Sequence, residues 1–205
     1  DSNVSYQDDL VRQLFEKLEA WGIAKDTMLI ITADHGDEQG EDGRVGHGAS
    51  LRDSVSHVPL VIHYPPLFPA GLVRAGTDVV DILPTVAEVL GVEYDDQWQG
   101  QSLLPLANGV GQEYPRMSFA SQYEEAHAAR VGRWKYHYGR RGAELFDVVA
   151  EPNEKKEISS SHPVAYQMMS DAFWIMRNWN TDWRKSHWGN ALNVSPTFAA
   201  AVEKQ

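Results

Sequence analysis

Residues 27–33 read Thr27-Met28-Leu29-Ile30-Ile31-Thr32-Ala33, an apolar run rich in β-branched side chains. Apolar residues on both faces of so short a run are typical of a buried central strand in a parallel sheet. Before this run, the apolar side chains of residues 10–21 fall within about 140° of helical arc, which predicts an amphipathic helix. A helix followed by a buried strand predicts an α/β fold with flanking helices.

Polar residues follow the predicted strand directly: Asp34, His35 and Gly36. In open parallel sheets, ligands bind beyond the carboxyl ends of the strands. A carboxylate and an imidazole at this point can face one cation, because the alternation of side chains lapses where the chain leaves the sheet. Asp34 and His35 are therefore candidate metal ligands. Asp followed by Gly is also typical of a plain turn, so the pair alone leaves both interpretations open.

An acidic, glycine-rich loop follows at residues 37–48, and it ends on His47 between Gly46 and Gly48. Counted from Asp34, the loop lacks the oxygen ligand and the glycine that an EF-hand needs at its third and sixth positions, so its carboxylates are interpreted mostly as a solvated face. The two glycines let the backbone at His47 approach a bound group. A neutral His47 could ligate a metal, whereas a protonated one could bind an oxyanion or protonate a leaving group.

The remaining pattern predicts two domains. A second buried strand is expected at residues 59–64 and a helix at residues 79–90. From residue 117 the pattern changes to alternation, with a hairpin over residues 130–148 and a final helix at residues 163–179. We therefore predict part of an α/β catalytic domain at residues 1–113, and a small antiparallel β subdomain with a C-terminal helix at residues 114–205.

Composition excludes several classes of protein. The net charge is −11 and no basic stripe occurs, which argues against nucleic acid as a partner. The absence of cysteine excludes disulfides and cysteine-ligated zinc. No apolar run approaches the length of about 18 residues that a membrane span needs. The compartment stays open between cytoplasmic and periplasmic or secreted. The chain starts within a predicted helix and without Met, as expected of a piece of a longer protein.

Seven segments, in the same order, closely resemble the second half of the sulfatase family of the alkaline phosphatase superfamily. They are Thr32-Ala33-Asp34-His35-Gly36-Asp37, Gly46-His47-Gly48-Ala49-Ser50-Leu51, Val58-Pro59-Leu60-Val61-Ile62, Val80-Asp81-Ile82-Leu83-Pro84-Thr85, Gly100-Gln101-Ser102-Leu103-Leu104-Pro105, Val131-Gly132-Arg133-Trp134-Lys135-Tyr136 and Glu144-Leu145-Phe146-Asp147. Together they cover roughly residues 6–155, which makes the resemblance far more specific than any single motif.

The resemblance implies an alkaline-phosphatase-like mixed or parallel sheet and a sulfuric ester hydrolase that uses a divalent metal, Ca²⁺ or else Mn²⁺ or Zn²⁺. Asp34 and His35 match two of the family's metal ligands, and His47 matches its catalytic contact to the sulfate or leaving oxygen. The family's nucleophile is a formylglycine made from a C/S-x-P-x-R motif. This chain has no such motif, so the nucleophile and the early acidic ligands are expected in a missing N-terminal half, and the isolated chain is predicted to be inactive.

Other interpretations stay open. The substrate is expected to be a small-molecule or glycan sulfate ester, but the Asp-His pair also occurs in relatives that cleave phosphonate monoesters or phosphodiesters. Hydrolysis by a serine–histidine–acid triad is disfavoured, because no G-x-S-x-G elbow occurs. A non-catalytic binding module would use the aromatic tail, Trp174, Trp179, Trp183 and Trp188, for which we favour core packing. A piece of a larger domain exposes apolar surface, which predicts self-association.

Overall fold

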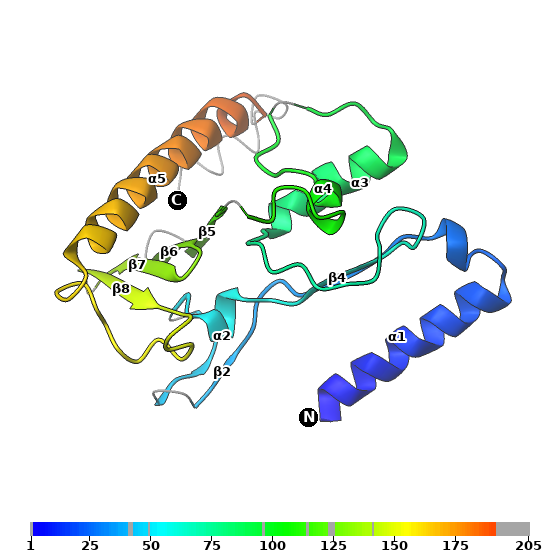
Figure 1. The fold of residues 1–205 in the computed structure, drawn as a ribbon, viewed down its shortest axis with the longest axis horizontal. Helices are drawn as coiled ribbons and strands as arrows, with labels where there is room; N and C mark the ends of the chain where they lie inside the picture. The colour runs from blue at the N-terminus through cyan, green and yellow to red at the C-terminus, as the bar shows by residue number, and fades with distance from the viewer. Residues whose placement is uncertain are drawn as a thin grey trace, which may run out of the picture. The chain divides into compact units, whose positions relative to one another are not determined.

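The computed structural model describes residues 2–40, 43–48, 50–95, 97–113, 115–122, 126–140 and 142–191. It has a mixed α/β architecture that divides into two compact units, Asp1–Ser118 and Phe119–Gln205 (Figure 1). The predicted boundary between a catalytic part and a β subdomain at residue 113 stays a prediction. Among the described residues, no helix is both long enough and apolar enough to cross a bilayer.

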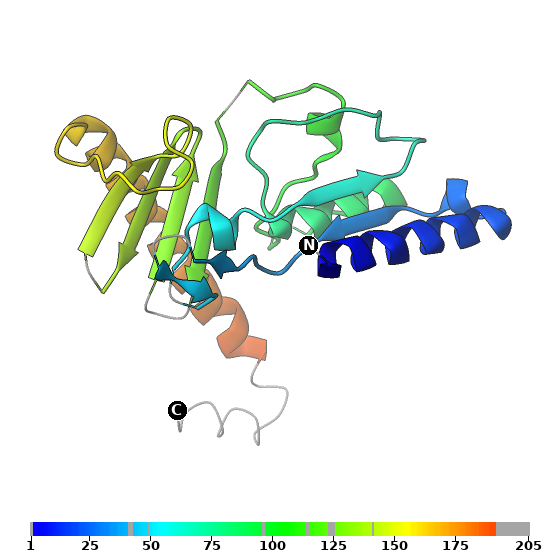
Figure 2. The same cartoon turned by 90° about the horizontal axis from the view of Figure 1, so that it is seen from below.

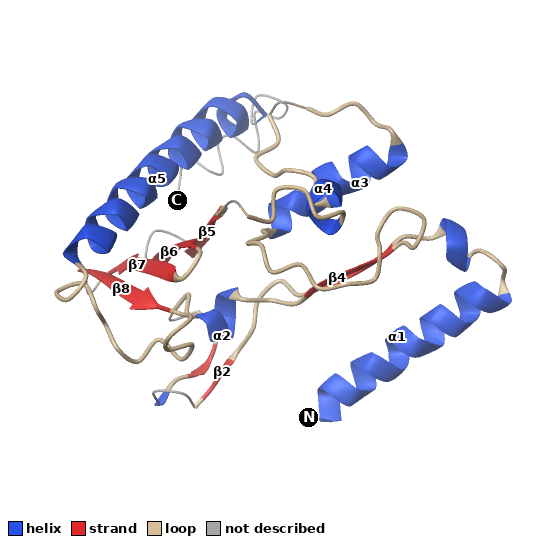
Figure 3. Cartoon of the chain, viewed as in Figure 1, coloured by secondary structure: helices blue, strands red, loops and turns tan. Residues whose placement is uncertain are grey.

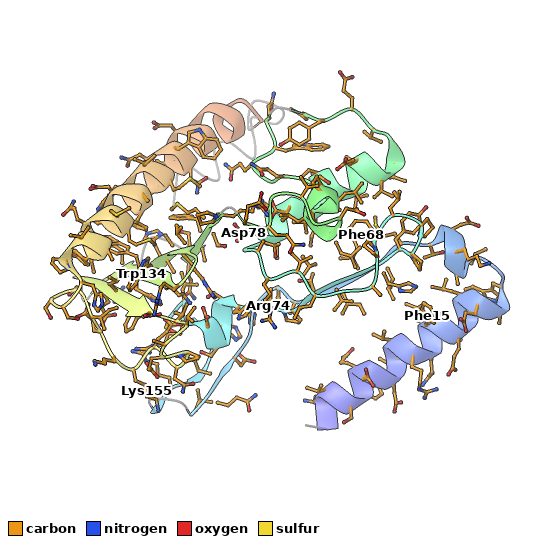
Figure 4. The ribbon with its side chains drawn as sticks, in the orientation of Figure 1. Phe15, Phe68, Arg74, Asp78, Trp134 and Lys155 are labelled. Atoms are coloured by element: carbon orange, nitrogen blue, oxygen red, sulfur yellow. The ribbon has the colours of Figure 1, made fainter. Side chains whose placement is uncertain are left out.

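The first unit is built around a helix and a pair of strands. Helix α1 (Ser2–Ala20) leads through a 3-10 turn (Ala24–Asp26) into β1 (Leu29–Thr32), which pairs with β4 (Leu60–His63). The predicted amphipathic helix is present and carries Phe15 (labelled in Figure 4). The Phe15 ring meets the His63 ring edge-on with centroids 5.0 Å apart. Leu18 is buried on the same helix. The helix is therefore fixed to β4 by the apolar stripe that the sequence pattern indicated.

The central parallel strand predicted at residues 27–33 has no parallel partner among the described residues. The partner of β1 is β4, with Leu29 opposite His63 and Thr32 opposite Leu60. Nor is β1 fully buried. An apolar run indicates that both faces of a strand are to be buried, but it does not indicate whether the neighbouring strand is parallel or antiparallel. A parallel return needs a long crossover, usually a helix. The only α-helix among the described residues between these strands is the four-residue α2 (Asp53–Ser56), and the chain returns antiparallel.

Hydrogen bonds among buried polar groups hold together the second half of this unit. This half contains a 3-10 turn (Val79–Asp81), α3 (Ile82–Leu90) and α4 (Leu104–Ala107). The carboxylate of Asp81, 2% exposed, accepts hydrogen bonds from the backbone N–H groups of Asp78 and Gln101 and from the Arg116 guanidinium. The Thr85 hydroxyl accepts from the Leu103 N–H at 2.8 Å. These bonds satisfy buried backbone donors and tie the loop before α4 to the start of α3.

The second unit is an antiparallel sheet covered by one long helix, as Figures 2 and 3 show. Its strands, in the order β5-β6-β7-β8, are β5 (Met117–Gln122), β6 (Ala126–Val131), β7 (Trp134–Gly139) and β8 (Gly142–Asp147). The small antiparallel sheet and the C-terminal helix predicted from the sequence are thus confirmed. Helix α5 (Pro163–Ala191) extends beyond the predicted end at residue 179.

Aromatic side chains join α5 to the sheet. Phe173 is fully buried, with its ring centroid 5.2 Å from that of Tyr136, and Trp174 meets Tyr138 at 5.0 Å. Core packing therefore accounts for Trp174. Trp179 is 48% exposed, and the side chains of Trp183 and Trp188 lie outside the described ones. Rings at these separations add to the free energy gained from their buried area.

A buried ion pair holds the opposite face of this sheet. The Lys135 ammonium lies 3.1 Å from one Glu154 carboxylate oxygen, and His137 Nε2 lies 2.7 Å from the other. Lys135 and Glu154 are both nearly inaccessible to solvent. Glu154 adopts a left-handed backbone conformation, φ 53°, which is uncommon for a residue with a side chain. The ion pair therefore anchors the loop after β8 to β7.

We expect Glu154→Ala to lower the free energy of unfolding of the second unit by about 3–5 kcal/mol, because it removes the carboxylate from a buried ammonium. Replacing both partners, as in Lys135→Met with Glu154→Leu, should cost less than Glu154→Ala alone. Urea unfolding followed by tryptophan fluorescence measures the loss. Arg12→Met, which removes two solvent-exposed ion pairs on α1, is the control and should leave the fluorescence midpoint unchanged. Equal losses from Glu154→Ala and the double replacement would contradict the buried-charge explanation.

Candidate functional site

The turn that follows β1 is held in place because the backbone of Gly36 packs closely against α2. The Gly36 N–H donates to the Val55 carbonyl of α2 at 2.8 Å. A Cβ added to Gly36 would lie 2.2 Å from the Ser54 carbonyl oxygen, far inside van der Waals contact. Only glycine allows this approach. The turn that carries Asp34 and His35 therefore has a fixed position against α2.

Asp34 and His35 lie with their polar atoms close together. The His35 backbone N–H donates to Asp34 Oδ1 at 2.9 Å, and His35 Nε2 lies 3.7 Å from Asp34 Oδ2. His35 Nδ1 lies 3.0 Å from the Gly36 carbonyl. A carbonyl can only accept, so Nδ1 carries the hydrogen and Nε2 of a neutral His35 keeps its lone pair. The Asp34 side chain, 89% exposed, and this nitrogen are both available to a ligand.

The pKa of Asp34 is lowered from its ordinary value. The main cause is the hydrogen bond from the His35 backbone N–H, and the charges of His35 and, more weakly, His47 act in the same direction. A carboxylate that accepts such a bond favours its ionised form. Asp34 therefore presents a negative oxygen to solvent beside an imidazole nitrogen.

A short hairpin brings His47 back to the same place. Strands β2 (Glu38–Gln39) and β3 (Val45–Gly46) pair antiparallel, with Glu38 opposite Gly46. Continuing this register by one residue puts Asp37 opposite His47. Asp37 Oδ1 indeed lies 2.8 Å from His47 Nδ1, and the rings of His35 and His47 have centroids 3.9 Å apart. One donor atom from each of His35, Asp37 and His47 lies within 4.8 Å of the other two.

Asp37 is the residue that the sequence analysis missed, because it was counted among the solvated carboxylates of the loop. A usable signal existed. The sequence places Gly40 and Gly43 in the loop, as in a hairpin turn, and a hairpin centred near them places residue 37 close to residue 47. In the structure both glycines have positive φ. The acidic composition of the loop concealed this pairing.

A buried carboxylate anchors the hairpin. Glu38, 2% exposed, accepts a hydrogen bond from the Ser50 hydroxyl at 3.0 Å and lies 3.7 Å from an Arg44 nitrogen. Ser50 lies just before α2, so the bond joins the hairpin to the element that also holds Gly36. The structure thus brings Asp34, His35 and His47 together in the first unit. His57, at 71% side-chain exposure, lies beside Asp53 of α2 at 4.0 Å, outside this group.

Comparison with known proteins gives a family model and a relative that are both described as sulfatases. The family model described as Sulfatase matches residues 1–92. A choline-sulfatase of Rhizobium meliloti is 32% identical over 200 residues, which cover 90% of this chain and 39% of that protein.

Among solved structures, BT4656 in complex with its substrate D-glucosamine-2-N,6-O-disulfate has a TM-score of 0.71 at 22% identity, over 85% of this chain and 39% of that one. The phosphonate monoester hydrolase SpPMH from Silicibacter pomeroyi has a TM-score of 0.72 at 22% identity, over 84% and 39%. These two likenesses show the fold. The chain therefore spans about two fifths of the length of each of these three proteins.

The contact between Gly36 and α2 yields a test of the site's construction. We expect Gly36→Ala to lower the melting temperature and to separate the His35 and His47 rings, because the new methyl group would overlap the Ser54 carbonyl. Cross-peaks between the two imidazole rings in NMR spectra measure the separation. Gly71→Ala adds the same methyl group where nothing lies within 4 Å, and it should leave both quantities unchanged. Unaltered ring cross-peaks in Gly36→Ala would show that this packing does not position the site.

Proposed function

Because this chain belongs to the sulfatase family, of the alkaline phosphatase superfamily, and spans only part of its relatives' length, we propose that it is a portion of a metal-dependent hydrolase of sulfate esters. The observation that carries the proposal is the pair at the end of β1. Asp34 Oδ2 and His35 Nε2 lie 3.7 Å apart, with the His47 ring against that of His35.

The donor atoms fit a divalent cation. Metal bonds to carboxylate oxygen and imidazole nitrogen are each about 2.0–2.2 Å long, so one ion can bridge two atoms that lie 3.7 Å apart. Asp34 and His35 would hold it, with the ionised carboxylate supplying charge. When bound, such a cation neutralises a sulfate oxygen and lowers the pKa of the attacking hydroxyl. An imidazole ligand favours Mn²⁺ or Zn²⁺ slightly over Ca²⁺.

His47 is the chain's candidate for direct contact with the substrate. It is 55% exposed at its side chain, and its ring lies beside His35, where a bound ester would be. In its protonated form it would donate a hydrogen bond to a sulfate oxygen or a proton to the departing ester oxygen. We assign it this catalytic and substrate-binding role.

We propose that the nucleophile, a formylglycine, belongs to the portion of the relatives' length that this chain does not span. The same portion would complete the sheet, adding the parallel strands expected from the sequence and covering apolar side chains of the first unit. These side chains are at least 41% exposed: Leu10, Leu14, Val61, Leu83 and Leu90. Alone, the 205-residue chain would be inactive and would self-associate through this surface.

A phosphonate monoester or phosphodiester hydrolase is the alternative reaction. The likeness to a solved phosphonate monoester hydrolase supports it, as does the imidazole at position 35. Sulfate and phosphate esters have similar tetrahedral geometry but differ in charge, so the donor groups seen here suit both.

The test is to assay the longer protein that contains this chain, reading its remaining sequence for C/S-x-P-x-R. Activity on 4-nitrophenyl sulfate is expected to exceed that on phenylphosphonate monoesters, to vanish with chelator and to return with Mn²⁺. His47→Ala should lower kcat by about 10²–10³-fold, as the loss of one donor to a developing oxyanion does. His57→Gln, outside the site, is the matched control. Turnover that survives both chelation and Asp34→Asn would refute the metal assignment.

A further inference from the structure

We propose that Asp37 is a positioning residue for His47: its carboxylate holds the Nδ1–H of His47 and so fixes the ring with Nε2 facing the ligand position. The consequence for catalysis rests on the proposed function of the site. The hydrogen bond and the tautomer it selects do not, because they follow from this chain alone.

The backbone brings the two residues together. Asp37 and His47 extend the β2–β3 register as an opposed pair, and residues directly opposite each other on an antiparallel pair have neighbouring side chains. The result is the 2.8 Å contact between Oδ1 and Nδ1. The buried Glu38, next to Asp37, is tied to Ser50 at 3.0 Å, so the hairpin that presents the pair is anchored at its base.

The contact selects one tautomer of His47. An ionised carboxylate only accepts hydrogen bonds, so the hydrogen must lie on Nδ1. Both the neutral Nδ1–H tautomer and the imidazolium carry this hydrogen, and the bond to Asp37 therefore holds the ring in either state. Without it, a neutral imidazole half exposed to solvent would exchange between its two tautomers and rotate.

The neighbouring imidazole is oriented by the same means. His35 Nδ1 lies 3.0 Å from the Gly36 carbonyl, another group that only accepts. Each of the two neighbouring rings, which are tilted by 36° to one another, therefore has its Nδ1 engaged by a fixed oxygen and its Nε2 left for a ligand. An acceptor that fixes the tautomer and orientation of a functional histidine is a known determinant of its reactivity. Asp37 would act on His47 in this way without touching substrate.

Imidazole nitrogen NMR on the 205-residue chain tests the tautomer. With ¹⁵N-labelled histidine at a pH where the rings are neutral, long-range ¹H–¹⁵N correlations distinguish Nδ1–H from Nε2–H, and the His47 pattern is identified by its loss in His47→Gln. We expect Nδ1–H in the wild type, a mixture or Nε2–H in Asp37→Asn, and restored Nδ1–H in Asp37→Glu. Asp53→Asn, which alters the analogous but longer contact to His57, should leave the His47 pattern unchanged.

Two results would overturn the proposal: a wild-type His47 with Nε2–H or mixed tautomers, and an Asp37→Asn variant with an unchanged Nδ1–H pattern. Should Asp37→Asn fail to give a dispersed spectrum, the wild-type and Asp37→Glu patterns decide. In the longer protein, Asp37→Asn should lower kcat by about 10–100-fold with little change in KM. A correct tautomer without any sulfatase activity would refute the proposed function and leave the positioning role of Asp37 intact.

Discussion

The contact between the Gly36 backbone and the first residues of α2 is the constraint on which the candidate site depends. It brings the end of β1 to within hydrogen-bond distance of the Val55 carbonyl, closer than any side chain would allow. From there the chain continues into the hairpin of β2 and β3. Because Glu38 is bonded to Ser50 just before α2, the hairpin returns to the same small region. Asp34, His35 and His47, separated along the sequence, thus share one position.

The site combines rigid supports with exposed functional groups. The supports are buried or closely packed backbone and carboxylate groups, whereas Asp34, His35, Asp37 and His47 remain accessible. Groups held this way keep their geometry while staying open to a ligand, which catalysis by electrostatic stabilisation requires. The surrounding unit has a further property: several apolar side chains on α1, β4 and α3 are exposed.

The second unit obtains its stability differently. One face of its sheet packs aromatic rings against α5, and the other buries the ion pair of Lys135 with Glu154. Both depend on the alternation of side chains along β7, where Tyr136 and Tyr138 face the helix while Lys135 and His137 reach Glu154. A buried charge pair contributes little net stability compared with an apolar pair of equal volume, but it penalises any arrangement in which one partner is lost. It therefore specifies the path of the loop after β8.

The sequence by itself determined the local elements and the residue types of the site. The stripe of α1, the hairpin of β7 and β8, and the placement of Asp34 and His35 after a strand all follow from periodicity and turn chemistry, which are properties of neighbouring residues. Only the tertiary structure decided the antiparallel partner of β1 and the pairing of Asp37 with His47. The partner depends on the route of the 27 residues between Thr32 and Leu60, and the pairing depends on a hairpin register that is fixed by the packing of Glu38 and Gly36. Both are set by contacts between residues distant in sequence, which local patterns do not encode.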